Sequence, residues 1–249
     1  MKIGITNVNG RMGKALINTA KEDESITISV GFSNKETTKT IFRTTTNIES
    51  LALDSDVIID FSNPKLLLQL LKEQVLIQKS IPLVIGTTGI SETEHRKIEK
   101  LSQYIPIVQD YNMSIGINLI CSTLPYFLET LKDFDVDITD KHHKYKTDSP
   151  SGTTKKILDI INSYGKNTIY NETFPDKQRP RDSVGINVIR AGNIFGQHDI
   201  SFVSKHETIN INHTALDREL FAEGAIKAAK WLRDKSPGLY SMKDVLGLG

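Results

Sequence analysis

Short apolar runs alternate with amphipathic stretches through residues 1–110, and this alternation restricts the possible folds more than any other feature. The apolar runs lie at residues 2–6, 26–32, 57–61, 82–85 and 105–109. Runs of this length are typical of strands, and the stretches between them have helical apolar spacing. Strands that alternate with helices form a parallel sheet with crossover helices. We therefore expect residues 1–112 to form an α/β domain with a Rossmann-like, doubly wound parallel sheet.

Two helix starts are clearly marked in this part of the chain. Asn63 is a preferred N-cap residue, and Pro64 occupies the first helical position, which proline favours. The helix that they begin is expected to continue through an apolar stripe of Leu66, Leu67, Leu70, Leu71 and Val75. Ser91 and Glu94 have the spacing of a capping box, which predicts a second helix to about Tyr104.

The pattern changes in the second part of the chain. A helix is expected over about residues 114–132. Four segments then alternate apolar and polar side chains, as strands with one exposed face do, at residues 134–140, 185–190, 198–204 and 208–213. The last two should form a hairpin across residues 205–207. These signals predict an α+β domain over residues 113–216, with a mixed or antiparallel sheet.

Two further segments have simple predictions. Residues 171–182 contain two prolines and many charges, so we expect a surface loop. Residues 218–234 have the apolar stripe of a helix that could pack back on the first domain. The first domain, residues 1–112, would therefore be completed by residues 217–249.

Composition excludes several classes of protein. The 249 residues carry a formal net charge of +1 and no basic run, so a nucleic-acid partner has little electrostatic support. The single cysteine, Cys121, rules out an internal disulfide and a cysteine-based metal cluster, and it should lie on the apolar face of a helix. Residues 2–6 resemble a strand rather than a signal peptide, and the longest apolar run, residues 66–71, is too short to cross a membrane. We expect a cytoplasmic protein.

The turn after the first strand occupies the place of a dinucleotide-binding fingerprint. It consists of Asn7-Val8-Asn9-Gly10-Arg11-Met12-Gly13 and leads into a helix expected over about residues 10–21. In such turns, glycines let a pyrophosphate approach the backbone at the helix N-terminus. Only two glycines are present, although asparagine tolerates positive φ and could preserve the turn. Because a glycine can stand at any strand–helix turn, the turn alone leaves cofactor binding open.

The end of the second strand bears on the choice of cofactor. The acidic residue that commonly contacts the ribose is missing, and Gly31-Phe32-Ser33-Asn34-Lys35 takes its place. Lys35 would tolerate the extra phosphate of NADP better than a carboxylate would, but it could equally be a solvent-exposed loop charge. The choice between NAD and NADP therefore stays open.

Residues 142–153 carry the strongest local signal for chemistry. An expected helix start, where hydroxyls, N–H groups and the helix dipole together form an anion site, contains Ser151, Gly152 and Thr153. Groups that could hold a carboxylate and transfer a proton stand just upstream, at His142, His143 and Lys146. The plainer alternative is a capped helix after a polar loop. A metal site is also possible, but it would need a third ligand. In addition, adjacent histidines on an extended chain point in opposite directions.

The segment from His142 to Thr153 resembles the signature of the dihydrodipicolinate reductase family, E-x-H-H-x-x-K-x-D-x-P-S-G-T. Further matches follow in the family's order along almost the whole chain, at residues 10–13, 60–62 with Pro64, 84–89, 112–116 with Asn118, 188–192, 221–225 and 237–246. Such an ordered set is highly specific, so the resemblance implies an NAD(P)H-dependent reductase of lysine and diaminopimelate synthesis.

The resemblance also implies roles for individual residues. The groups that transfer protons would be His142 and Lys146. Substrate contacts would be His143, Gly152 and Thr153, with Ser151 beside them. NADH or NADPH would contact Asn9, Gly10, Arg11, Met12, Gly13, Lys14, Gly86, Thr87, Thr88, Asp110, Tyr111, Asn112 and Met113, with Lys35 as a further candidate. No metal is implied.

The implied reaction is hydride transfer to a cyclic, unsaturated dicarboxylate that forms from 4-hydroxy-tetrahydrodipicolinate by loss of water. Residues 113–216 would bind this small-molecule substrate and build a homotetramer through their exposed sheet. Two alternatives are a non-catalytic NAD(P)-binding sensor of the same fold and a reductase or amino-acid dehydrogenase acting on another acid. The complete segment at residues 142–153 argues against both.

The chain departs from the family pattern at a few positions. Asn7 and Asn9 replace two glycines of the cofactor turn, and the acidic ribose residue is absent. Asp140 stands where the family commonly has glutamate, and Gln197 replaces another frequent glutamate. These departures bear on cofactor affinity and on the NAD/NADP preference rather than on the reaction.

Overall fold

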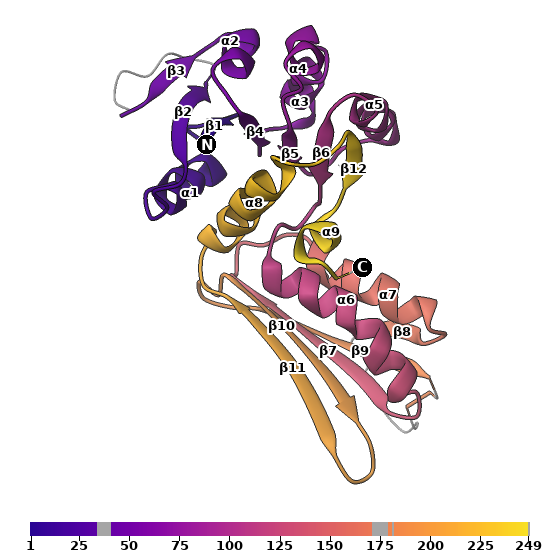
Figure 1. Ribbon diagram of the computed structural model, residues 1–249. Coiled ribbons are helices and arrows are strands. Elements are labelled where there is room, and N and C mark those ends of the chain that lie inside the picture. The colour runs from indigo at the N-terminus through magenta and orange to yellow at the C-terminus, as the bar shows by residue number, and fades with distance from the viewer. Residues whose placement is uncertain (34–40, 171–178, 181, 249) are drawn as a thin grey trace. The chain divides into compact units, whose positions relative to one another are not determined.

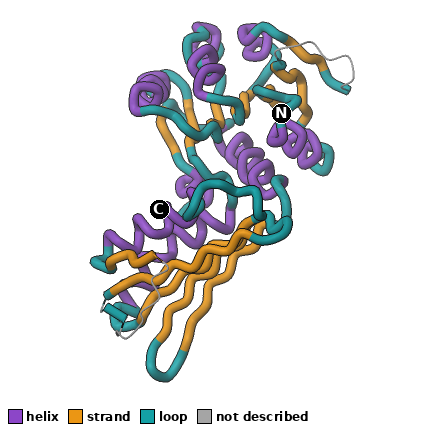
Figure 2. The backbone as a smooth tube through the Cα atoms, turned by 180° about the vertical axis from the view of Figure 1, so that it is seen from behind, coloured by secondary structure: helices purple, strands orange, loops and turns teal. Residues whose placement is uncertain are grey.

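The protein divides into two compact units, each with its own sheet (Figures 1 and 2). The structure, a computed structural model, describes residues 1–33, 41–170, 179–180 and 182–248. The first unit comprises residues 1–115 and 218–249, and the second comprises residues 116–217.

The first unit contains a seven-stranded sheet in the order β12-β6-β5-β4-β1-β2-β3, and every neighbouring pair is parallel. Its strands are β1 (Lys2–Ile5), β2 (Thr27–Phe32), β3 (Arg43–Thr45), β4 (Val57–Asp60), β5 (Leu83–Ile85), β6 (Pro106–Gln109) and β12 (Gly238–Tyr240). Its helices are α1 (Arg11–Ala20), α2 (Ile48–Leu53), α3 (Pro64–Leu70), α4 (Gln74–Gln78), α5 (Glu92–Ser102), α8 (Glu219–Leu232) and α9 (Met242–Leu246).

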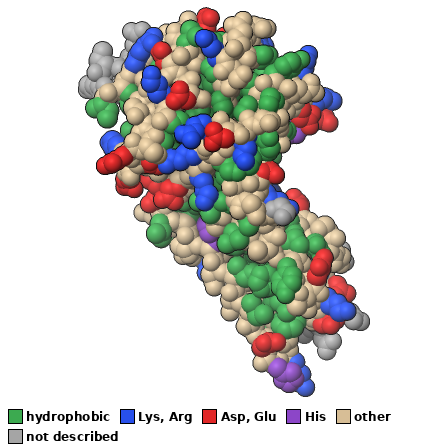
Figure 3. All heavy atoms as spheres, viewed as in Figure 1, with side chains coloured by type: hydrophobic (Ala, Val, Ile, Leu, Met, Phe, Trp, Pro, Cys, Tyr) green, Lys and Arg blue, Asp and Glu red, His purple; other side chains and the backbone are tan. Residues whose placement is uncertain are grey.

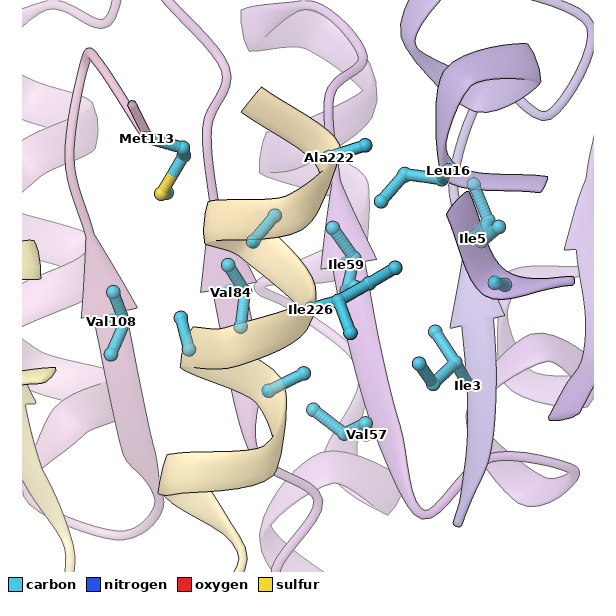
Figure 4. Packing of buried hydrophobic residues seen from close by; sticks show 14 of the residues in the cluster. Ile3, Ile5, Leu16, Val57, Ile59, Val84, Val108, Met113, Ala222 and Ile226 are labelled. Carbon is cyan, nitrogen blue, oxygen red and sulfur yellow. The ribbon is translucent and has the colours of Figure 1, made fainter. Parts of the chain in front are cut away.

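Apolar side chains cover both faces of this sheet, which confirms the doubly wound α/β prediction. Successive residues of β4 belong to different cores, because strand side chains alternate between faces. Ile59 packs in a cluster with residues of α1 and α8, whereas Ile58 packs in a second cluster with residues of α2, α3, α4 and α5. Figure 4 shows Ile226 of α8 beside Ile59, and Ala222 of the same helix on the side of Leu16. The predicted packing of this late helix on the first sheet is therefore confirmed.

Some elements of the first unit differ from the prediction. The helix that begins at Pro64 ends at Leu70, and a tight turn separates it from α4, although Asn63 caps it as expected. Its last turn closes with i→i−3 bonds from Lys72 N to Gln69 O and from Glu73 N to Leu70 O. No glycine or proline marks this break, so the apolar periodicity predicted one continuous helix where the structure has two. The elements β3, α2, β12 and α9 were also missed, because each is short.

The second unit contains a five-stranded sheet in the order β11-β10-β7-β9-β8. Its elements are α6 (Ile115–Thr130), which begins at the last residue of the first unit, β7 (Asp135–His142), α7 (Gly152–Ser163), β8 (Asn167–Tyr170), β9 (Ser183–Arg190), β10 (Gly196–Val203) and β11 (Thr208–Ala215). β10 is antiparallel to both β7 and β11, whereas β7 and β8 run parallel to β9. The sheet is therefore mixed, within the range predicted, and the hairpin between β10 and β11 is confirmed.

One face of this sheet packs against α6 and α7. Cys121 and Leu124 of α6 share a core with Ile157 of α7 and Phe202 of β10. Cys121 is buried and lies on the apolar side of its helix, as expected. Most of the loop predicted at residues 171–182 lies outside the described residues, and β8 was not predicted.

The face of the protein shown in Figure 3 carries charged side chains of both signs. Lys and Arg side chains lie among Asp and Glu side chains on the face shown in Figure 3. Among the described residues, no helix is both long enough and apolar enough to cross a membrane.

Candidate active site

The segment from His142 to Thr153, which carries the predicted site residues, begins inside a strand rather than after it. β7 continues to His142, two residues beyond the predicted end, so Asp140 and His142 point to the same face of the sheet. Asp140 is fully buried and His142 is 8% exposed, whereas His143 is only half-buried. The strand geometry therefore joins His142 to Asp140 and separates it from His143.

Asp140 is the centre of a buried polar cluster. One carboxylate oxygen, Oδ1, lies 2.7 Å from Nδ1 of His142. The other oxygen, Oδ2, accepts a 2.7 Å hydrogen bond from the backbone N–H of Ser151 and lies 3.3 Å from Nη2 of Arg190. One side chain of β7 is thus held by the start of α7 and by the end of β9.

The surroundings of Asp140 keep its carboxylate charged. Burial by itself would raise the pKa of Asp140. The contact with His142, the N–H of Ser151 and the charge of Arg190 outweigh burial and hold that pKa well below its usual range. Asp140 therefore offers a fixed negative charge beside the imidazole of His142.

A second imidazole, that of His198, borders the same carboxylate. His198 lies directly opposite Asp140 in the β7–β10 register, and its Nε2 is 3.1 Å from Ser151 Oγ and 3.8 Å from Asp140 Oδ1. Burial lowers the pKa of His198 to about 4, against the opposing charge of Asp140. The side chain is therefore neutral near pH 7. Sequence reasoning missed His198, because only the strand register brings it beside Asp140.

The N-terminus of α7 has the form expected of an anion site. Ser151 is the N-cap residue, and its hydroxyl accepts a 3.2 Å hydrogen bond from the N–H of Thr154. The same hydroxyl contacts His198 Nε2, and Ser151 is 2% exposed. Gly152, the first residue of the helix, is exposed. Ser151 is thus buried beneath the helix start, whereas Gly152 and Thr153 lie at the surface.

The loop before α7 places the predicted proton donor. Lys146 Nζ lies 2.8 Å from Asp148 Oδ1, and the Lys146 N–H donates to the carbonyl of His143. Arg190 donates a 2.8 Å hydrogen bond to the carbonyl oxygen of Asp148. Since Arg190 also contacts Asp140, one guanidinium joins this loop to the buried cluster. Arg190 belonged to a recognised motif, yet its role as a link could not be read from the sequence.

The first unit contains a separate hollow of about 380 Å³ at the carboxyl ends of its strands. Such an edge is where open α/β sheets bind nucleotides. Among the predicted cofactor residues, those that line it are Arg11, Met12, Gly86, Thr87, Thr88, Tyr111 and Met113. It is also lined by Asn7, Phe61, Ser62 and Phe221, which were noted only as departures or motif matches.

The glycine turn beside this hollow fits a dinucleotide. A Cβ on Gly13 would lie 2.5 Å from Val8 O and 2.7 Å from Asn7 O, so only glycine fits there. Asn7 has a φ of 50°, which confirms that an asparagine preserves the turn. Gly10 caps α1 without a side chain, and the first turn of α1 has no acidic residue. Free N–H groups at this N-terminus suit a pyrophosphate.

Other predicted cofactor residues do not line the hollow. Asn9 donates a 2.7 Å hydrogen bond to Ser33 Oγ. The backbone N–H of Asn112 donates to the carboxylate of Asp110, and the side-chain oxygen of Asn112 accepts from the N–H of Ser114. Of the predicted contacts in the described chain, those absent from the lining are Asn9, Gly10, Gly13, Lys14, Asp110 and Asn112. Lys35 lies outside the described residues.

A buried carboxyl group ties together the strand ends beneath the hollow. Asp60, fully buried at the end of β4, receives hydrogen bonds of 2.5–2.6 Å from the hydroxyls of Thr6, Ser62 and Thr87. Burial raises the pKa of Asp60, although the three hydroxyls act in the opposite direction. Since Ser62 and Thr87 line the hollow, Asp60 holds two of its walls in place.

The fold and these two sites define a nucleotide-dependent oxidoreductase with a Rossmann-like unit and a separate α+β unit. Models of the N-terminal and C-terminal parts of dihydrodipicolinate reductase match residues 1–113 and 116–246. The chain belongs to the dihydrodipicolinate reductase family, whose members use NADH or NADPH.

Individual relatives agree with this assignment. A 4-hydroxy-tetrahydrodipicolinate reductase of Caldanaerobacter subterraneus is 38% identical across 100% of this chain and 99% of the relative. One from Clostridium tetani is 39% identical across 99% and 97%. Among solved structures, a dipicolinate-bound dihydrodipicolinate reductase from Paenisporosarcina sp. TG-14 has a TM-score of 0.82, with 20% identity and 97% coverage of both chains. That structure supports the fold.

Proposed function

We propose that this protein reduces dehydrated 4-hydroxy-tetrahydrodipicolinate to tetrahydrodipicolinate in lysine and diaminopimelate synthesis. The observation that carries the proposal is the Asp140–His142 pair beside the N-terminus of α7. A fixed carboxylate, an imidazole and an anion-binding helix start are the groups that a dicarboxylate needs in order to be held and protonated.

Binding of the substrate is assigned to the start of α7. The N–H groups of Gly152 and Thr153 and the positive end of the helix dipole would bind one carboxylate. His143 and Lys146 would contact the substrate from the preceding loop. Ser151 supports this arrangement through its cap and through its N–H bond to Asp140, rather than by touching the substrate.

Proton transfer is assigned to His142 and Lys146. The negative charge of Asp140 holds a proton on Nδ1 of His142, so Nε2 is the atom that accepts the transferred proton and later releases it. Lys146 would deliver the proton that completes the reduction, and Asp148 positions its ammonium group. When bound, the nicotinamide cofactor supplies the hydride.

The hollow of the first unit is assigned to this cofactor. The start of α1 would hold the pyrophosphate, and the wall formed by residues 86–88 would border the nicotinamide. In this proposal, residues 1–112 with 217–249 bind the cofactor, and residues 113–216 bind the substrate. It also includes a homotetramer, as the family resemblance implies, and the cytoplasmic location expected from the sequence.

One spectrophotometric assay tests the proposal. Freshly generated 4-hydroxy-tetrahydrodipicolinate is mixed with the protein and NADH or NADPH, and cofactor oxidation is followed by absorbance. We expect oxidation that depends on the substrate, and its rate with each cofactor measures the preference. Cofactor binding without oxidation would favour the sensor alternative, and oxidation only with a different acid would favour another dehydrogenase.

A further inference from the structure

Asp140, His142 and His198 together have the donor atoms of a metal site. One oxygen or nitrogen atom from each residue lies within 4.8 Å of the corresponding atoms of the other two. The third ligand that the sequence could not supply comes from the strand register, since β10 places His198 opposite Asp140. His143, the sequence neighbour of His142, takes no part in the group.

All three side chains are withdrawn from water. Asp140 is fully buried, His198 is 5% exposed and His142 is 8% exposed. Asp140 Oδ1 and His142 Nδ1 lie 2.7 Å apart, and within the described residues no third group forms a hydrogen bond with either atom. A bound ion would give both of these buried atoms a further partner.

The carboxylate is already oriented for coordination. Its Oδ2 is held by the N–H of Ser151 and by Arg190, which leaves Oδ1 directed toward the two imidazoles. Metal-binding carboxylates are commonly hydrogen-bonded in this way through the oxygen that does not coordinate. The guanidinium of Arg190 opposes a cation, yet it lies on the far oxygen, so it weakens binding without blocking access to Oδ1.

We propose that Asp140, His142 and His198 form a Zn²⁺ site. Two imidazoles and one carboxylate are a ligand set that zinc accepts, and the remaining position would be open to water. Bound zinc would occupy Nδ1 of His142 and displace the proton that Asp140 holds there. Zinc would therefore inhibit proton transfer by His142 reversibly. This consequence rests on the proposed function, whereas the binding itself does not.

Metal binding is tested on the chelator-treated full-length protein. Calorimetric titration with Zn²⁺ and the visible absorption of bound Co²⁺ report binding without any need for turnover. We expect one ion per chain, and binding about tenfold or more weaker in His198→Ala. His206→Ala removes an exposed histidine of the same unit and should bind as the unaltered protein does. His198→Gln keeps more of the buried volume if the alanine variant folds poorly.

The same preparations separate the inference from the proposed function. Equal Zn²⁺ affinity in the unaltered protein and both His198 variants would overturn the site, as would no binding at all. If zinc binds at these residues but no reductase activity is found, the site stands and the proposed function fails. If the protein is active, zinc should inhibit it, and inhibition should weaken with binding in the His198 variants.

Discussion

Replacing Asp140 by asparagine should change which nitrogen of His142 carries a proton. The amide oxygen is expected to take the place of Oδ2, because Ser151 N–H and Arg190 both donate there. The amide NH₂ group then faces Nδ1 of His142, which must accept rather than donate. The imidazole proton consequently moves to Nε2, and the side chain meets its substrate in the wrong tautomer.

The contacts of Asp140 set the expected loss of stability and the expected loss of turnover. A hydrogen bond to a charged group contributes about 1.5–3 kcal/mol and a neutral one about 0.5–1.5 kcal/mol. Two donors contact Oδ2, so the loss of charge should cost about 2 kcal/mol of unfolding free energy. Loss of correct general acid–base catalysis should lower kcat by about 10²–10⁴. The KM for cofactor should change little, because the hollow is formed by other residues.

Urea unfolding and steady-state kinetics measure these two effects separately. Asp140→Glu is the matched control, since it keeps the charge and restores the residue common in the family. The glutamate variant should retain most of the turnover. If Asp140→Asn turned over substrate as fast as the unaltered protein, Asp140 would not set the tautomer of His142, and the mechanism above would be wrong.

Three further predictions concern the first unit. Gly13→Ala should weaken NADH binding sharply, because the added Cβ would meet Val8 O at 2.5 Å; binding followed by NADH fluorescence checks this, and unchanged affinity would contradict it. Ile226→Ala should lower the unfolding free energy by about 2–5 kcal/mol, whereas the same change at the 38%-exposed Ile77 should cost much less in the same urea titration. Burial raises the pKa of Asp60, so the folded state holds its proton to higher pH than the unfolded state does. Stability should therefore fall as pH rises from about 4 through the pKa of folded Asp60, and Asp60→Asn should remove that contribution; an unchanged pH slope would refute it.

Five strands of the first sheet, β1, β2, β4, β5 and β6, could be predicted because their signals are local. The strand at residues 57–60 begins with three consecutive apolar residues, and Ser91 with Glu94 forms the predicted capping box. The division between α3 and α4 could not be predicted, because the apolar stripe continues across it and no breaker marks it.

The candidate site was predictable where its residues are neighbours in the chain. The segment from His142 to Thr153 includes the helix start that the structure places at Gly152. His198 and Arg190 reach Asp140 through pairings across the sheet, and no local pattern specifies such a register. For the same reason, the sequence attributed the proposed chemistry to a loop, whereas the candidate site is arranged around the buried carboxylate of Asp140.

The position of α8 has a consequence for synthesis of the chain. Residues 2–109 contain six of the seven strands of the first sheet, but the helix that covers Ile59 and Val84 begins only at Glu219. While the ribosome makes the intervening residues, one apolar face of that sheet has no α8 to cover it. A nascent chain in this state exposes apolar surface, which favours aggregation. We therefore expect this face of the sheet to need protection until α8 has been synthesised.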